Sequence, residues 1–383
     1  MSHMLSIHPM DMYAIKQYKD YLLYQRKRSE SPTPYHSQHR DILRNTKPFT
    51  SSSIYADSLS FLDAMRHSRD IDHVKIYYRE LLQNNPKEAI RLINDEKLQF
   101  SSLFLLEPLI MEFSIADQLS LKNKMAIDFM HEANSPNKSV LSNGCSLCDY
   151  IQTASSTLKW IFETGINDDG LNNQYDKILD MTAILLSKVY KDKTALAPII
   201  DTIFQRHKKG HYIHDLVWAF LECRDPFSFI VIGSHLLSDD QKDIKLACRL
   251  LHFVPGIDFN STTDRHHQYL QLLNWIEENG LFLQYTGDSF QQSPHPIPYI
   301  VIHSAKYLCK IVCVDTGATL APCSEEDSIL INEFEKLDND MQQRLSSFSY
   351  LMHQKDIHWW NNWIQYPLHE QIKIAQMRME GGI

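Results

Sequence analysis

The chain has 383 residues, of which 43% are hydrophobic and 22% are charged, an ordinary balance for a protein that forms a core. Its formal net charge of −9 opposes overall attraction to a nucleic-acid backbone. No apolar run reaches the ~18 residues that a membrane-spanning helix needs, so we expect no transmembrane segment.

Cysteine and glycine usage narrow the class further. The seven cysteines are an odd number, and the first residues lack a basic segment followed by an apolar one; both favour a reducing, cytoplasmic environment. Secretion without a cleavable signal stays open. Only 11 residues are glycine, against an average usage of ~7%. We therefore expect few of the tight turns and phosphate loops that use glycine. The oligomeric state cannot be read from these numbers.

Residues 1–53 are predicted to form a short helix and an arm. Ile15, Tyr18 and Leu22 follow a helical period within residues 10–24. Residues 29–53 are rich in Ser, Pro, Thr and His, as extended linkers are.

Residues 54–280 carry the signals of successive helices. Apolar side chains recur at helical spacing, as at Val74, Tyr77, Tyr78 and Leu81 and along residues 171–189. Helix starts are predicted at Asn85-Pro86, Asp225-Pro226 and Ser238 to Gln241, and a helix end at Gly280. These patterns predict a mainly α fold of stacked antiparallel helical hairpins.

One of these stretches resembles a known repeat. Residues 239–255 resemble the inner helix of a HEAT-type repeat, although no repeat is visible letter by letter, and the pattern covers about half of the chain. The resemblance implies a solenoid-like body that presents a concave helical surface to a partner protein.

After Gly280 the period changes. Residues 281–285, 299–303 and 306–315 read as short strands, and Thr316-Gly317 as a turn into residues 318–320. We predict a small antiparallel β-meander near residues 281–323, in a segment that we bound at residues 281–325. Residues 326–383 return to helices with a tryptophan-rich end.

Asp315-Thr316-Gly317-Ala318 follows an apolar run and resembles the catalytic loop of aspartic proteases, in which two aspartates share one proton. The chain has no second Asp-Thr/Ser-Gly, and helices are predicted close to the motif on both sides. An ordinary hairpin turn is therefore the favoured interpretation.

A group of histidines is the candidate metal site, which would favour an enzyme instead of a scaffold. His207, His211 and His214 would face one way on a continuous helix, as zinc ligands can. His214-Asp215 resembles the metal-binding pair of the all-helical HD phosphohydrolases, but their further ligands are not recognisable here. Gly210 also interrupts the pattern. We favour no metal and no cofactor.

The cysteines offer no stronger site. Cys145 and Cys148 form a single C-x-x-C without the second pair that structural zinc requires. Cys309 and Cys313, if on one strand, would lie too far apart for a disulfide. Reduced thiols are expected.

The segment His358-Trp359-Trp360-Asn361-Asn362-Trp363, followed by Tyr366, holds three of the six tryptophans. Tryptophan is favoured both at binding hot spots and in sealed cores. The favoured interpretation is a cap over the end of the helical array. The candidate partner-binding residues are Trp359, Trp360, Trp363 and Tyr366.

The sequence therefore predicts a non-catalytic scaffold or adaptor for a protein partner. No nucleotide-binding, zincin or serine-hydrolase motif is present to favour an enzyme. The alternatives are a metal-dependent hydrolase that uses His207, His211, His214 and Asp215, and a translocated effector that binds a host protein. The predicted segments are residues 1–53, 54–280, 281–325 and 326–383.

Overall fold

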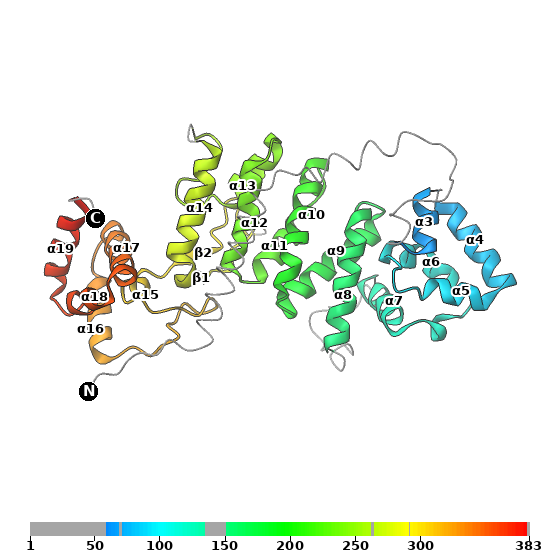
Figure 1. The fold of residues 1–383 in the computed structure, drawn as a ribbon, viewed down its shortest axis with the longest axis horizontal. Helices are drawn as coiled ribbons and strands as arrows, with labels where there is room; N and C mark the ends of the chain where they lie inside the picture. Colours follow the sequence, from blue (N-terminus) through cyan, green and yellow to red (C-terminus); the bar gives the residue numbers. More distant parts are fainter. Residues whose placement is uncertain (1–58, 69–70, 135–150, 262–263, 291, 381–383) are drawn as a thin grey trace. The chain divides into compact units, whose positions relative to one another are not determined.

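A computed structural model describes residues 59–68, 71–134, 151–261, 264–290 and 292–380. The predicted N-terminal helix and arm, Cys145 and Cys148 lie outside these residues. Within them the chain forms seventeen α-helices and one two-stranded antiparallel sheet, which confirms the mainly α prediction (Figure 1). No helix of this part is long and apolar enough to cross a membrane.

The first described helices pack mainly against their neighbours in sequence. As predicted, Asn85 caps a helix that starts at Pro86, because its side chain accepts a hydrogen bond from the Glu88 N–H. The buried Asp63 carboxylate accepts from Ser60 and Ser102, joining the first helix to the fourth. These helices are α3 (Phe61–Ser68), α4 (Ile71–Asn84), α5 (Pro86–Ile93), α6 (Phe100–Glu112) and α7 (Leu121–Asn134).

The middle helices are joined by buried ion pairs. Arg206 donates to Asp169 and Asp180, each at 2.6 Å. Burial raises the pKa of Asp180 to about 7, outweighing the opposing effect of Arg206. The helices are α8 (Ile151–Gly165), α9 (Asn173–Ile184) with a π-helical extension (Leu185–Val189), α10 (Leu196–Lys209) and α11 (His214–Glu222).

The last of the next three helices ends at Gly280, as predicted. Gly280 has an ordinary helical φ of −54° rather than a left-handed one. A side chain there would collide with the Phe227 ring, so close packing is what requires glycine. The helices are α12 (Phe229–Ser234), α13 (Gln241–Leu250) and α14 (Arg265–Asn279).

The β region is smaller than the predicted meander. Strands β1 (Leu283–Tyr285) and β2 (Tyr299–Val301) pair antiparallel, with Gln284 opposite Ile300. The predicted strand over residues 306–315 needs correction, because it begins in helix α15 (His303–Tyr307). Its second part forms a hairpin in which Val312 bridges Thr319. Thr316-Gly317 lies at the turn, and Gly317 has a φ of +71°.

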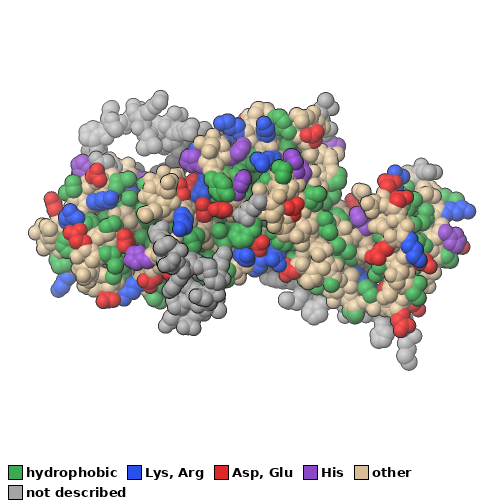
Figure 2. Space-filling model, turned by 180° about the vertical axis from the view of Figure 1, so that it is seen from behind, with side chains coloured by type: hydrophobic (Ala, Val, Ile, Leu, Met, Phe, Trp, Pro, Cys, Tyr) green, Lys and Arg blue, Asp and Glu red, His purple; other side chains and the backbone are tan. Residues whose placement is uncertain are grey.

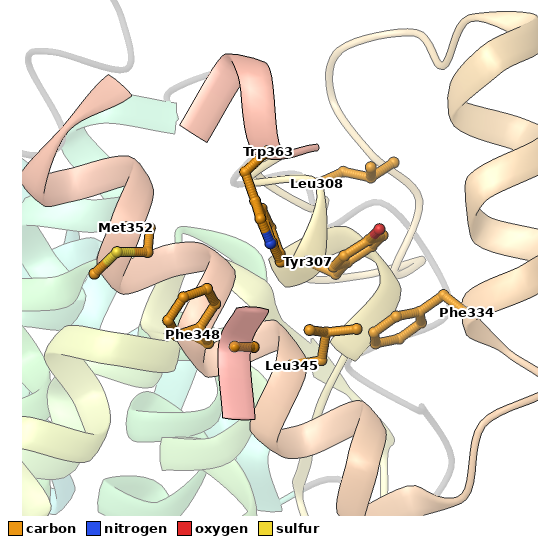
Figure 3. Packing of buried hydrophobic residues seen from close by; sticks show 8 residues of the cluster. Tyr307, Leu308, Phe334, Leu345, Phe348, Met352 and Trp363 are labelled. Atoms are coloured by element: carbon orange, nitrogen blue, oxygen red, sulfur yellow. The ribbon is translucent and has the colours of Figure 1, made fainter. Parts of the chain in front are cut away.

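The final helices surround an aromatic core (Figure 3). Lys306 of α15 is buried, and its ammonium group donates to Glu278 and Asn279 at the end of α14 and to Ser347 of α17. This lysine therefore joins three helices. The remaining helices are α16 (Glu325–Phe334), α17 (Asn339–Lys355), α18 (Ile357–Trp363) and α19 (Leu368–Glu380).

Candidate partner-binding site

The tryptophan-rich segment forms α18, and one residue, Asp356, fixes where this helix begins. The Asp356 N–H donates to the Met352 carbonyl at the end of α17. The Asp356 side chain accepts from the Trp359 N–H at 2.9 Å and so caps the start of α18. The chain turns at this corner, and α18 packs against α17.

Trp363 belongs to the hydrophobic core. It is 1% exposed, its ring contacts Phe348 edge to face at a centroid distance of 5.4 Å, and its indole N–H donates to the Gln371 carbonyl. Tyr307 stacks on Phe334 beside it (Figure 3). Direct contact between Trp363 and a partner therefore needs correction, because its whole surface is used in packing.

Trp359 and Trp360 are half-buried and serve mainly as packing residues. The Trp359 ring stacks with Trp363 at 6.0 Å, and the Arg378 guanidinium lies 4.1 Å from its centroid. The Trp360 indole N–H donates to the Ser349 hydroxyl at 2.8 Å. Of the four candidates only Tyr366 is exposed, at 43% of its surface. This arrangement agrees with a structural role for the tryptophans.

An open apolar pocket of about 80 Å³ lies beside this core, between α17 and α19. Leu345 and Ala375 also belong to the aromatic core, so the pocket opens onto it. Arg344, which is paired with Asp340 and well exposed, adds a cationic group. The lining residues are Met341, Arg344, Leu345, Ile372, Ala375, Gln376 and Met379.

The size and lining of the pocket limit what it can hold. Its volume is several times the ~10–15 Å³ that one water requires, and below the ~300–1,000 Å³ of sites for small molecules and cofactors. Its lining offers no cysteine, histidine or carboxylate for catalysis or metal binding. An apolar side chain fits this lining, and the two methionines can adapt to its shape.

The sequence contained one signal for this pocket that the prediction missed. Leu368, Ile372, Ala375 and Met379 recur at helical spacing along one side of α19, which is buried at Ala375 and becomes exposed at Met379. The pocket itself depends on the distance at which α17 and α19 pack. A periodic pattern within one helix does not predict that distance.

The histidine cluster is divided between two helices. His207 lies in the last turn of α10, and Gly210 ends that helix with a φ of +75°. His214 begins α11 and stacks against Phe290. Burial and then the nearby Arg249 lower the pKa of His207. The continuous helix assumed for the metal site, with Asp215 as its fourth ligand, is therefore absent.

The other sequence motifs also have structural roles. Asp315 accepts from Arg224 at 2.8 Å, and Gly317 donates to the Cys313 carbonyl to close the hairpin turn. Cys309 follows α15 rather than sharing a strand with Cys313. Among the residues placed in the structure, no three His, Cys, Asp or Glu side chains are grouped to hold a metal ion.

Comparison of the chain with protein-family models, with curated proteins and with solved structures finds no match.

Proposed function

We propose that the chain is a non-catalytic protein-interaction scaffold whose α17–α19 pocket binds an apolar side chain of a partner protein. The open pocket of about 80 Å³ is the observation that supports this function. A helical body with a HEAT-like pattern suits the role, because such bodies commonly hold partner proteins. The fold class alone would not distinguish this role from others.

The chemistry of the pocket defines the side chain that it would accept. Leu345, Ile372 and Ala375 offer only hydrocarbon to a ligand, while Met341 and Met379 supply flexible thioethers. A leucine, isoleucine or methionine of the partner would fill this space without leaving a polar group unpaired. An acidic residue beside it would reach the exposed Arg344.

The distribution of charge favours an apolar anchor. On the face of the molecule in Figure 2, acidic and basic side chains are intermixed. Charge alone therefore marks no extended binding surface on that face. A buried apolar contact surrounded by weaker polar ones is also the usual arrangement of binding energy at protein interfaces.

Two exposed methionines of α19 provide a matched test. Met379 lines the pocket and is 39% exposed, whereas Met377, two residues earlier, is 60% exposed and does not line it. We expect Met379→Glu to lose partners that wild type and Met377→Glu both retain in crosslinking and pull-down experiments. Far-UV circular dichroism would confirm that both variants are folded. Identical partners for Met379→Glu and wild type would contradict the proposed site.

A further inference from the structure

The connection between β1 and β2 packs over an apolar surface of the helices. We call residues 286–290 and 292–298 the strap. Its Phe290, Pro296 and Pro298 share one small cavity with apolar residues of four helices, among them Ile203, Phe220 and Leu250. Only about 10 Å³ remains open there, at the lower limit of the ~10–15 Å³ that one water needs. The strap and the helices therefore fit closely.

The strap closes on itself through its own hydrogen bonds. Thr286 donates from its backbone N–H to the Pro298 carbonyl and from its hydroxyl to the Ile297 carbonyl, at 3.0 and 2.6 Å. The Ile297 N–H donates to the Asp288 carboxylate at 2.9 Å. These bonds join strap residues to each other, so they can persist if the strap leaves the helices.

Ring contacts hold the strap at its edges. The Arg249 guanidinium lies 4.5 Å from the Phe290 ring centroid, and His214 stacks against the same ring at 6.0 Å. Further along, His295 contacts His252 at 5.7 Å. Such contacts recognise an aromatic ring rather than one particular chain.

The second half of the strap presents alternate residues to the helices. Pro296 and Pro298 are buried, whereas His295 before them and Ile297 between them are exposed. Proline restricts the backbone before binding, so a segment with three prolines, at positions 294, 296 and 298, loses little conformational entropy when it docks. Extended peptides bind to grooves in this alternating manner.

We propose that the surface formed by α10, α11, α12 and α13 is a peptide-binding groove, which the strap occupies as an internal substitute for a partner. The partner segment would carry an aromatic residue, then a turn, and then two prolines separated by one residue, as Phe290, Pro296 and Pro298 are arranged around the turn closed by residues 289 and 293. This groove is separate from the α17–α19 pocket and extends the scaffold role to a second surface.

The strap sequence itself is the probe for the test. A fluorescein-labelled peptide of residues 286–299 is titrated into the full chain and into Phe290→Ser/Pro296→Ser/Pro298→Ser, with fluorescence anisotropy as the readout. We expect the variant to bind at least tenfold more tightly than wild type, because in wild type the tethered strap competes at high effective concentration. A peptide with the same three serines is the negative control.

Two exposed residues of α13 distinguish specific docking from general attraction. Arg249 contacts the Phe290 ring, whereas Lys245, four residues earlier, is exposed and lies outside the groove lining. In the strap-weakened chain, Arg249→Glu should reduce peptide affinity at least fivefold and Lys245→Glu should not. Equal losses in the two would show that charge alone attracts the peptide, and would overturn the proposal.

The remaining outcomes also decide the proposal. A folded variant that does not bind the peptide, or that binds the serine control equally, would show that the strap is a permanent cover. Dimerisation of the variant in light scattering would identify a second copy as the occupant instead of a partner. If the triple variant does not fold, Phe290→Ala replaces it, because Phe290 is only half-buried. Failure of the Met379 test alone would leave this groove unaffected.

Discussion

Asp168 and Asp169 are consecutive residues whose carboxylates bind arginines from helices far apart in sequence. Asp168 accepts from Arg66 of α3 and Asp169 from Arg206 of α10, each at 2.6 Å. The arginine side chains are only 6% and 5% exposed. A single turn after α8 therefore joins the first described helix to the middle of the helical body.

Removal of one of these arginines should be strongly destabilising. Arg206→Met leaves the Asp169 carboxylate buried without its cation, which typically costs about 3–5 kcal/mol. Urea unfolding followed by circular dichroism measures the change. Arg79→Ala is the control, because the Arg79–Glu112 pair is about half exposed, and such pairs contribute about 0–1 kcal/mol. Equal losses for the two variants would contradict a structural role for the buried pair.

Acid should weaken the fold through His235. The imidazole of His235 stacks on the Phe204 ring with 3.6 Å between the ring centroids, and burial lowers the pKa of His235 to about 4. Because the unfolded chain has a pKa near 6.5 and binds the proton more readily, stability is complete above that pH and falls between about 6.5 and 4.

The contribution of His235 can be isolated by difference. Between pH 7 and pH 5 we expect wild type to lose about 2 kcal/mol more unfolding free energy than His235→Phe. Urea denaturation at each pH measures it, and subtraction cancels the other histidines. His369→Gln serves as the control, since the side chain of His369 is 81% exposed. A pH dependence unchanged in His235→Phe would exclude this residue as the cause.

Gly280→Ala should destabilise the chain through steric overlap. The new methyl group would meet the Phe227 ring, and overpacking of this kind costs about 1–3 kcal/mol. Phe227→Leu, which removes the ring, should restore part of the loss in the double variant. Thermal unfolding of both single variants and the double variant completes the cycle. Strict additivity would mean that the two residues do not compete for space.

The α17–α19 pocket should take up a small apolar probe. With ¹³C-labelled methionine methyl groups, titration of cyclohexane into the full chain should shift the signals of Met341 and Met379. Met111 is 46% exposed in α6 and outside the pocket, so it reports non-specific binding. Shifts of similar size at Met111 would remove the evidence for a defined site.

Local helix signals were the most predictable part of the fold. The Asn85 cap and the start at Pro86 follow from the sequence, because their interactions involve only neighbouring residues. The helix start predicted at Ser238 was wrong by two positions. Asp240 caps α13 instead, while the Ser238 hydroxyl binds the Asp240 N–H and the Asp243 carboxylate. Neighbouring polar side chains compete for the same backbone groups.

Long-range packing explains what the sequence pattern missed. Lys306 begins a segment that was predicted to be a strand, yet it lies in α15 with its ammonium group buried, because α14 and α17 supply three acceptors. The tryptophan cluster could be predicted as a cap or as a binding site. The burial of Trp363 assigns that residue to the core, and the binding role of the other three candidates stays a prediction. The pocket depends on the spacing of α17 and α19, which no local period encodes.

The corner at Asp356 imposes a strict length on the chain. One residue ends α17 and begins α18, and each residue of a helix advances its face by about 100°. Insertion of a single residue would separate the two capping roles and rotate the indoles away from Phe348. The aromatic core thus depends on the number of residues at this bend as much as on their identity.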